Sequence, residues 1–533
     1  MSDLRKQRAL VWFKRDLRIH DHAALVAAQS HHDALALFVI EPEWLQSPEC
    51  DSSHVAFALG CLAELRTALA QRGMPLLVRT GSCVSVLAQL HTQTGFTHLL
   101  SHEETGPGWS YTRDIHVATW CQSKHVLWQE FTQTGVVRRL RNRSGWAGRW
   151  QARMDAPLHL LDGGFAPAVT LDQPELPSLA QLDLPAHAKH LQPAGEKAAR
   201  STLKSFLQVR GYDYRKALSS PLTAADGCSR LSPHLAYGTL SMRTVHQATE
   251  VAIGHTPDRD LAYALRGFAG RLRWHCHFMQ KLEDEPGIEF HNFARICDGL
   301  RENDFNDDHF AAWCEGRTGY PMVDACMRSL LATGWLNFRM RAMLVSFASY
   351  HLWLHWRPTG LFLARHFLDY EPGIHWSQMQ MQSGTTGINT LRIYSPTKQA
   401  QDQDPQGLFI RRWVPELARV PLPYLAEPWK MAASVQHMAG CTIGADYPAP
   451  VVDDKLSMKA AKDRMYGLRK TEEAREEAAS VQAKHGSRRS GLPQTGQRHK
   501  TERGQSAKPE AKRETKREID NQSVAPAQGD LFA

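Results

Sequence analysis

The sequence predicts an α/β domain with a parallel sheet covered by helices on both faces, then a large all-α domain, then a disordered basic C-terminal tail. Three observations predict this order. Short continuous apolar runs alternate with helical patterns over the first 135 residues, as in sheets buried on both faces. Apolar residues recur at helical spacing in the second half. From residue 485 onward Gly, Ser, Gln, Lys and Pro dominate and large apolar residues are almost lacking, which is typical of disorder.

The α/β domain is expected to span residues 8–135. No G-x-G-x-x-G or P-loop pattern follows any of its apolar runs, so no nucleotide-phosphate cradle is predicted in this domain. The predicted strands are Ala9–Phe13, Ala34–Ile40, Pro75–Arg79, His98–Ser101 and Val126–Phe131, and the clearest helices between them are Val55–Gln71 and Val84–Leu90.

A proline-rich stretch separates the two domains. The segment Pro157–Pro193 has six prolines and few periodic apolar positions, so it is predicted to run over the surface; the whole interdomain connector is assigned to residues 136–197. The helical domain is expected at residues 198–447 and the charged, largely disordered tail at 448–533. The clearest helices of the second half are Leu261–Lys281, Met322–Thr333 and Phe338–Trp356.

The formal net charge of +8 is concentrated in the tail. Residues 455–520 contain 18 Lys or Arg and 10 Asp or Glu, so this stretch alone carries a charge of +8. The rest of the chain is near neutral, and any basic surface that faces DNA must come from local patterning. No apolar run is long enough for a membrane-spanning helix, so no membrane association is expected.

The ten cysteines are scattered and form no C-x-x-C pair. This pattern indicates buried thiols in a reducing compartment rather than disulfides or a zinc site. We therefore expect a cytoplasmic protein, monomeric, with no residue assigned to a metal. An iron–sulfur cluster with ligands far apart in the sequence is the alternative that the pattern leaves open.

Three stretches carry a family resemblance. The first is Leu10–Leu25, the second is Cys228–Ser241, and the third runs from Trp313 to Leu417 through GYPMVDA, RIYSP and FIRRWVPEL. In this order and spacing they resemble the photolyase/cryptochrome family over roughly residues 8–430. The resemblance implies a helical domain that holds FAD in a bent, U-shaped form. It also implies that the α/β domain is an antenna domain, a candidate site for a second chromophore of the folate or deazaflavin type.

A dinucleotide such as FAD needs hydrogen-bond donors for its pyrophosphate. Ser229, Arg230 and Ser232 supply two hydroxyls and a guanidinium, and a helix start at Leu231 supplies backbone N–H groups. A plain helix-capping motif is the alternative reading of these residues. The resemblance adds Tyr214, which matches a family tyrosine near the same phosphates.

By the same resemblance, Arg341 and Asp369 match the family's ion pair beside the isoalloxazine ring. A buried Arg needs a carboxylate partner, and an anionic flavin gains from a nearby cation; a purely structural salt bridge is the alternative. Glu371 replaces the second Asp of a family D-x-D pattern. His375 stands where repair enzymes of the family usually place an Asn facing flavin N5. A titratable ring there is expected to donate a hydrogen bond or a proton, which leaves the redox preference open.

The family's tryptophan relay carries an electron from the surface to the photoexcited flavin. Trp313 and Trp356 match its outer and middle members. The flavin-proximal position falls at Met379, so the usual triad is broken, and Trp376 or Trp353 is the expected substitute. A purely structural role in the core is the alternative for these tryptophans.

The pocket for a damaged base departs from the family pattern. Trp274 matches a stacking tryptophan, but Arg271 stands where family enzymes place a Glu one helical turn earlier. The family's dimer-binding Asn aligns with Phe338, next to Asn337, and the second stacking Trp aligns with Met381. We therefore expect altered DNA contacts or a different lesion. The same predicted helix offers three further side chains for phosphate or base: Arg273, His275 and His277.

These features favour a DNA photolyase that repairs pyrimidine photoproducts by electron transfer from excited, reduced FAD to a flipped-out lesion. A blue-light photoreceptor of the cryptochrome type, signalling through its tail, is the first alternative; the altered pocket and the long tail favour it. A flavin-bearing DNA-binding protein with little light chemistry is the second.

The expected partners are damaged DNA and a replication protein. The last residues resemble the short peptide by which bacterial repair proteins grip the sliding clamp. Leu531 and Phe532 are suited to an apolar pocket, and Gln528 and Asp530 complete the pattern at its edge. A chance match of so short a motif is the alternative.

Overall fold

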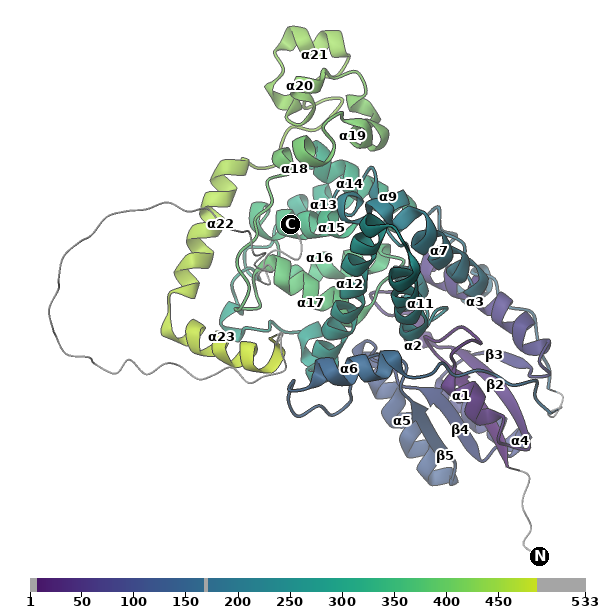
Figure 1. Cartoon of the computed structure of the whole chain (residues 1–533). Coiled ribbons are helices and arrows are strands. Elements are labelled where there is room, and N and C mark those ends of the chain that lie inside the picture. Colours follow the sequence, from purple (N-terminus) through teal and green to yellow (C-terminus); the bar gives the residue numbers. More distant parts are fainter. Residues whose placement is uncertain (1–6, 167–170, 487–533) are drawn as a thin grey trace, which may run out of the picture.

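The five predicted strands form one parallel sheet in the order β3-β2-β1-β4-β5 (Figure 1). The computed structural model describes residues 7–166 and 171–486, so the clamp-like peptide at 528–532 lies outside the described residues. The strands are β1 (Arg8–Phe13), β2 (Asp33–Ile40), β3 (Leu76–Thr80), β4 (His98–His102) and β5 (Leu127–Phe131).

Helices cover both faces of this sheet, because successive side chains of a strand point to opposite faces. Val11 of β1 packs on one face in a hydrophobic cluster with α1 and α3. Its neighbour Leu10 packs on the other face with α4 and α5. The predicted α/β class is therefore confirmed. The helices of this domain are α1 (Ala23–Ala28), α2 (Pro42–Leu45), α3 (Ser52–Ala70), α4 (Cys83–Thr94) and α5 (Gly108–Lys124).

Part of the predicted connector belongs to the helical core. Helix α6 (Trp146–Asp155) lies within residues 136–197, and its Trp150 is buried in one hydrophobic cluster with Phe268. Trp146, Trp150 and Met154 are spaced one turn apart, which gives α6 a single apolar face. Helix α6 precedes the segment Pro157–Pro193 that is predicted to run over the surface, and the domain boundaries stay predictions.

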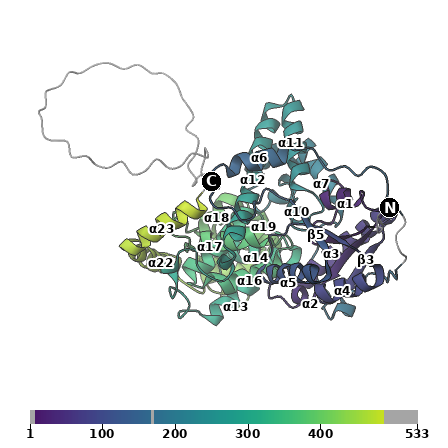
Figure 2. The ribbon, with the colours of Figure 1, turned by 90° about the horizontal axis from the view of Figure 1, so that it is seen from below.

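The second half is helical, as predicted. Helices α12 and α17 pack against each other, and α11 flanks α12 (Figures 1 and 2). The helices are α7 (Glu196–Gln208), α8 (Tyr214–Ala217), α9 (Ala224–Gly227), α10 (Ser232–Ala236), α11 (Met242–His255), α12 (Arg259–Asp284), α13 (Asp307–Glu315), α14 (Pro321–Thr333), α15 (Phe338–Ser346), α16 (Trp356–His366), α17 (Pro372–Ser383), α18 (Pro396–Gln403), α19 (Leu408–Trp413), α20 (Leu422–Leu425) and α21 (Ala433–Ala439).

The single helix predicted at 338–356 is wrong. Helix α15 gives way to a π-helical turn, Phe347–His351, and Trp356 begins the next helix. Trp353 adopts a left-handed backbone conformation with φ of 54°, which a continuing helix does not allow. His355 then caps the new helix by accepting a hydrogen bond from the Arg357 N–H at 3.3 Å.

Two charged helices that were assigned to the tail dock on the helical domain. They are α22 (Asp454–Arg469) and α23 (Glu472–His485), and each buries apolar side chains such as Met465 and Val481. Asp454 also pairs with His351 at 2.7 Å. The charged tail predicted at 448–533 therefore begins with two docked helices, and the disorder predicted from residue 485 onward falls outside the described residues except at 485 and 486. Each helix has only a narrow apolar face, which is difficult to recognise in so highly charged a sequence.

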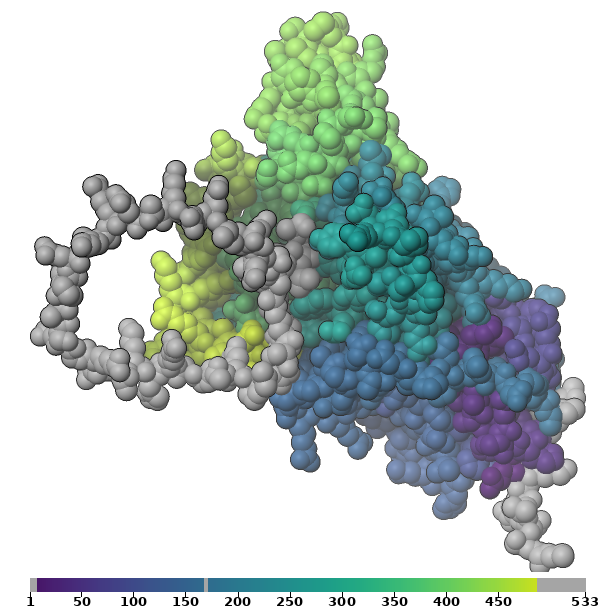
Figure 3. Space-filling view, in the orientation of Figure 1, coloured from purple at the N-terminus to yellow at the C-terminus, as the bar shows by residue number. Residues whose placement is uncertain are grey.

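Helices α19 to α21 form a lobe that projects from the rest of the molecule, in light green at the top of Figure 3. No helix in the described part of the chain combines the length and apolar character that crossing a membrane requires. All ten cysteines are free thiols. Within the described ranges they contribute to no group of candidate metal ligands, so the iron–sulfur alternative has no support there.

One buried cluster in the α/β domain has candidate metal ligands, but its geometry is that of a hydrogen-bonded core. Asp16 Oδ2 lies 2.7 Å from His102 Nδ1 and 3.0 Å from His22 Nε2. His22 Nδ1 accepts the Leu25 N–H at 3.1 Å, so Nε2 carries the ring proton and points it at Asp16. Burial opposes ionisation of Asp16, yet the two histidines hold its pKa well below the usual range.

Candidate functional site

A cavity of about 330 Å³ lies in the helical domain and is lined mainly from α12, α15, α17 and the loop before α10. It brings together most of the predicted site. The predicted residues on its wall are Tyr214, Ser229, Arg230, Ser232, Arg271, Trp274, Asn337, Arg341, Asp369, Glu371 and His375. Five predicted residues are not on this wall: Leu231, Trp313, Trp356, Trp376 and Met381.

The loop before α10 presents its donors from a constrained backbone. Arg230 has a left-handed φ of 60°, which is unusual for a residue with a side chain and marks a site held by its surroundings. Arg210, which sequence reasoning missed, fixes this loop by donating to the carbonyls of Cys228 (2.6 Å) and Ser229 (3.2 Å). The Arg230 guanidinium lies 3.9 Å from the Trp335 ring centroid. Burial lowers the pKa of Arg230 to about 10, so it stays cationic at neutral pH.

Leu231 is not on the cavity wall, and its side chain is buried in the core; its predicted contribution is the backbone N–H. Its backbone N–H lies 3.4 Å from the Ser229 hydroxyl oxygen. Helix α10, which follows, has only five residues. The donors of this loop are therefore mainly hydroxyl and guanidinium groups rather than a long helix terminus.

Arg341 and Asp369 form a bidentate ion pair on the cavity wall, with both N···O distances 2.9 Å. Asp369 is buried, which alone would raise its pKa, but Arg341 and the Ser232 hydroxyl hold it below the usual value. Arg341 also donates to the Leu336 carbonyl at 2.6 Å and stacks 4.0 Å from the Phe367 ring centroid. The pair is thus fixed and charged at neutral pH.

Several buried polar atoms on the wall have no partner in the described protein. They are Asn337 Oδ1, His275 Nδ1, Gln378 Nε2 and Gln382 Oε1. Buried polar groups are normally satisfied, so this wall is built for a ligand with its own donors and acceptors. A flavin ring with its polar edge, joined to a pyrophosphate, has the chemistry that these groups need, and the residues present fit FAD.

Sequence reasoning missed Gln378 and Gln382, although a signal existed. Glu371, His375, Gln378 and Gln382 follow at helical spacing along one face of α17. A row of polar residues along one face of a buried helix indicates that this face lines a cavity. The signal lies in the spacing of several residues and not in any one of them.

His375 is held by the backbone in one protonation state. Its Nε2 lies 2.9 Å from the Gly360 carbonyl oxygen, which only accepts, so Nε2 carries the proton. Burial lowers the pKa of His375 to about 4, so the ring is neutral at pH 7 and Nδ1 is an acceptor. In this state the ring offers an acceptor at Nδ1 at neutral pH, and its role toward a cofactor stays a prediction.

Behind His375 the aromatic side chains form a continuous path. Its ring centroid lies 4.9 Å from that of Trp376, and Trp376 lies 5.8 Å from Trp356. Both tryptophans are fully buried, and the Trp356 indole donates to Asn292 Oδ1 at 2.7 Å. Trp313 is also fully buried in the same hydrophobic cluster.

The predicted DNA residues fall into two groups. Trp274 and Arg271 line the cavity from α12, and Arg271 interacts with the Tyr214 hydroxyl. Asn337 is buried and its amide donates to two backbone carbonyls at 3.0 Å, so this group supports the fold. His277 is buried against Trp274, with ring centroids 5.1 Å apart. It therefore cannot contact DNA in this structure, contrary to the sequence-based expectation.

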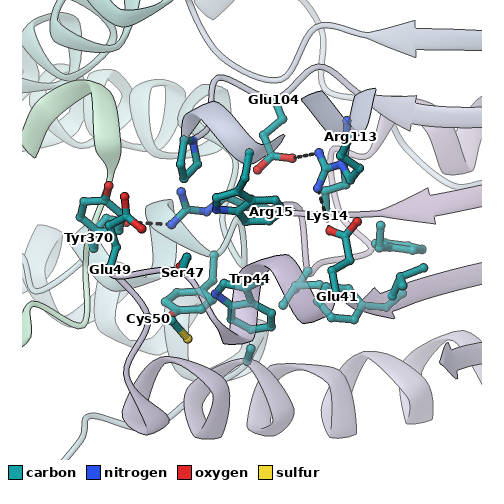
Figure 4. A pocket seen from close by; sticks show the side chains of 18 of the residues that line it. Lys14, Arg15, Glu41, Trp44, Ser47, Glu49, Cys50, Glu104, Arg113 and Tyr370 are labelled. Atoms are coloured by element: carbon teal, nitrogen blue, oxygen red, sulfur yellow. Dashed lines mark hydrogen bonds and ion pairs between the residues drawn. The ribbon is translucent and has the colours of Figure 1, made fainter. Parts of the chain in front are cut away.

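A second cavity, of about 90 Å³, lies at the carboxyl ends of β1 and β2 (Figure 4). Arg113 donates to Glu41 (3.0 Å) and Glu104 (2.6 Å) on its wall. Burial raises the pKa of Glu41 to about 7. Figure 4 shows Arg15 pointing toward Tyr370, whose carbonyl accepts from the guanidinium at 2.7 Å. This cavity therefore touches the segment that carries Asp369.

Each of the two domains matches a known protein-family model. The family model described as DNA photolyase matches residues 9–144, and that described as FAD binding domain of DNA photolyase matches residues 268–467. The deoxyribodipyrimidine photo-lyase of Escherichia coli is 31% identical over 84% of this chain and 96% of its own length. Cryptochrome DASH of Gloeobacter violaceus is 28% identical over 86% of this chain and 95% of its own length.

Among solved structures, a bacterial class III photolyase from Agrobacterium tumefaciens has a similar fold. Its TM-score is 0.76 at 26% identity, and the match covers 88% of this chain and 99% of that one. The matches extend over both domains and include the cavity wall from α12 to α17. This chain belongs to the photolyase/cryptochrome family and carries its FAD-binding domain.

Proposed function

We propose that this protein is a light-driven DNA photolyase that repairs pyrimidine photoproducts. The observation that carries the proposal is a single cavity lined both by the groups suited to FAD and by Trp274, an aromatic platform suited to a flipped-out base. The photo-lyase name of the Escherichia coli relative supports it. Bound FAD would supply light absorption and the electron for repair.

The cavity residues have separate tasks in this proposal. Ser229, Arg230 and Ser232 bind and orient the phosphates. The Arg341–Asp369 pair places a fixed cation beside a ring that carries negative charge when reduced, and Asp369 keeps the guanidinium in position. Trp274 stacks on the extruded base, and Arg271 replaces the family's carboxylate as its polar neighbour.

Electrons reach the flavin through Trp356 and Trp376, and Trp313 is the proposed outer member, although it is fully buried and its ring centroid lies 5.7 Å from that of Phe362. The ring contacts favour Trp376 as the substitute for the missing proximal member, because it bridges Trp356 and His375. Trp353 is a poor candidate. Two guanidinium groups, of Arg301 and Arg464, lie 4.4 and 4.8 Å from its ring centroid and disfavour a positive charge on that indole.

The test is a repair assay with two substrates. Reduced, purified protein is illuminated with an oligonucleotide that contains either a cyclobutane dimer or a 6–4 photoproduct, with a dark control for each. The proposal expects light-dependent loss of one lesion over several turnovers. Loss of neither lesion, in protein that holds FAD and absorbs blue light, rejects it.

A cryptochrome-type photoreceptor is the second candidate. The altered lesion contacts at Arg271, Phe338 and Met381 favour it. In that case illumination changes the redox state of the flavin without repair, and the change alters the protease sensitivity of the segment after α23. The repair assay separates the two functions directly.

We also propose a second chromophore in the α/β cavity of Figure 4. Its aromatic lining residues Trp12, Trp44 and Trp109 suit a flat ring system. A volume of about 90 Å³ is small for such a ring, so binding requires side chains such as Arg113 to move. Reconstitution with a deazaflavin or a folate is expected to give energy transfer to FAD from one of them, and Trp44→Ala to abolish it. Failure of both pigments to bind rejects a chromophore at this site.

Damaged DNA and the sliding clamp are the proposed partners. The clamp peptide rests on the sequence Gln528-Gly-Asp-Leu-Phe532 alone. A peptide of the last ten residues is expected to bind the clamp, and a Leu531→Ala, Phe532→Ala version is not. No binding by the unaltered peptide at high micromolar concentration rejects this partner.

A further inference from the structure

A small polar cavity separates the two domains beside the FAD cavity. Its volume is about 40 Å³, enough for water, which needs about 10–15 Å³ per molecule. The α/β domain contributes Asp16 and His102, and the helical domain contributes His275 and Glu371. Most of its other lining side chains are also polar or charged, so water in this cavity would find hydrogen-bond partners.

Two residues line both this interdomain cavity and the FAD cavity, and they form the partition between them. These residues are Glu371 and His275. Glu371 is buried, and His275 Nδ1 is a buried atom without a partner in the described protein. A carboxyl group and an imidazole thus stand between a water-sized polar space and the place where the flavin is proposed to lie.

The surroundings of Glu371 make its charge easy to change. Its cation is Arg15, whose Nη1 lies 3.6 Å from Oε1 and whose other terminal nitrogen donates to the Tyr370 carbonyl. The pKa of Glu371 is raised to about 7, chiefly by burial; Arg15 opposes this shift, and the charges of Glu104 and Asp369 add to it. Cys276 on α12 is close enough to Glu371 to interact with its charge. It is a neutral thiol, because burial raises its pKa to about 11.

We propose that Glu371 exchanges a proton with the interdomain cavity whenever the charge of the bound flavin changes. This inference rests on the proposed function. Each electron that an external thiol supplies in light adds one negative charge beside Glu371. The carboxylate then takes one proton from bulk solvent through cavity water and becomes a neutral carboxylic acid, and reoxidation returns that proton. His275 positions the water on the partition.

The raised pKa of Glu371 determines the pH range in which it can take up a proton when the flavin is reduced. Below pH 6 Glu371 is protonated whatever the flavin charge, so it takes up nothing. Near pH 7.5 it is mostly ionised beside oxidised flavin and becomes protonated when negative charge is added. The extra proton uptake is therefore present around pH 7.5 and lost as the pH falls toward 5.5.

The experiment counts protons with a pH-indicator dye while a thiol photoreduces the FAD-loaded full chain. Glu371→Gln is compared with Glu103→Gln, a matched control whose parent side chain lines only the interdomain cavity. At pH 7.5 wild type and the control are expected to take up more protons per flavin than Glu371→Gln, by up to one, and at pH 5.5 all three are expected to agree. Glu371→Asp, which keeps a carboxyl group, is expected to retain the uptake.

Equal proton uptake by wild type and Glu371→Gln at pH 7.5 overturns the inference. If Glu371→Gln loses FAD, Arg15→Gln decides instead: removing the cation must move the uptake window to higher pH, and an unmoved window overturns the inference. A wild-type protein without FAD contradicts the proposed function rather than this proton exchange. A protein that holds FAD and repairs DNA but shows no Glu371-dependent uptake contradicts only the exchange.

Discussion

Trp376 meets Trp356 edge to face, with ring centroids 5.8 Å apart and planes inclined by 71°. Both indoles are fully buried, and Trp376 reaches the cavity through His375. The loss of a tryptophan at Met379 is therefore accompanied by another indole on the same helix, three residues earlier. Geometry favours an unbroken aromatic route to the flavin cavity.

The first prediction concerns this route. Trp376→Phe and Trp356→Phe are each expected to slow photoreduction by an external thiol about tenfold or more, which corresponds to about 1.4 kcal/mol in the barrier. Trp353→Phe is the matched control and is expected to leave the rate unchanged, because its ring lies against two guanidinium groups. Flash photolysis measures the rate. Normal rates in both of the first two variants reject the route.

The second prediction concerns the ion pair in the cavity. Asp369→Asn leaves the Arg341 cation without its bidentate partner, and breaking a buried pair typically costs about 3–5 kcal/mol. We expect weaker retention of FAD or a shifted flavin potential. Lys398→Gln, which removes an exposed ion pair with Asp402, is the control and should change neither. Unchanged flavin content and spectra in Asp369→Asn would show that the pair lies away from the cofactor.

The third prediction concerns DNA. Trp274→Ala is expected to reduce the preference for damaged over intact DNA by about 1–3 kcal/mol if a base stacks on the indole. Overall affinity should fall as salt rises, because phosphate contacts release counterions. Equilibrium binding at several salt concentrations measures both effects. Equal affinity of wild type and variant for the two DNAs would favour the photoreceptor function.

The fourth prediction concerns pH and the contact between the domains. His54 Nε2 donates to the Phe367 carbonyl at 3.0 Å, and burial lowers the pKa of His54 to about 4. The unfolded chain binds this proton near pH 6.5, so stability is lost as pH falls from 6.5 toward 4, by about 1.4 kcal/mol per pH unit. His54→Gln can keep the N–H donor and removes the titration.

Urea unfolding between pH 7 and 4 provides the measurement for His54. The unfolding free energy of the variant should fall less per pH unit than that of wild type, and the difference should correspond to about one bound proton. Identical slopes would mean that His54 titrates normally in the folded protein.

The sequence predicted the sheet well because the central strands β1 and β2 are nearly continuous apolar runs, a signal that needs no tertiary information. Most of the predicted site residues, such as Arg341 and Asp369, line one cavity in the helical domain, and their roles toward FAD stay predictions. Gln378 and Gln382 were not predicted because a single glutamine gives no signal of burial; only their helical spacing with Glu371 and His375 indicates a shared face. Only the packing of α17 against α12 turns that face into a wall.

Two features of the helical domain were not predicted because they depend on tertiary contacts. The break between α15 and α16 depends on the left-handed backbone of Trp353, a residue type that gives no local warning. Helices α22 and α23 are highly charged and have few apolar residues, so the sequence alone does not predict that they dock on the helical domain. Their docking depends on contacts to distant segments, such as Glu477, which accepts the N–H groups of Arg295 and Ile296 at 2.6 and 2.9 Å.

The action spectrum of repair tests the central claim most directly. Dimer loss per absorbed photon is measured at wavelengths from the near ultraviolet to the blue, with reduced protein and a lesion-containing oligonucleotide. The account predicts that repair follows the absorption of the bound, reduced flavin and disappears in a variant that has lost FAD. Repair that is absent at every wavelength, or that is unchanged after the flavin is removed, would contradict it.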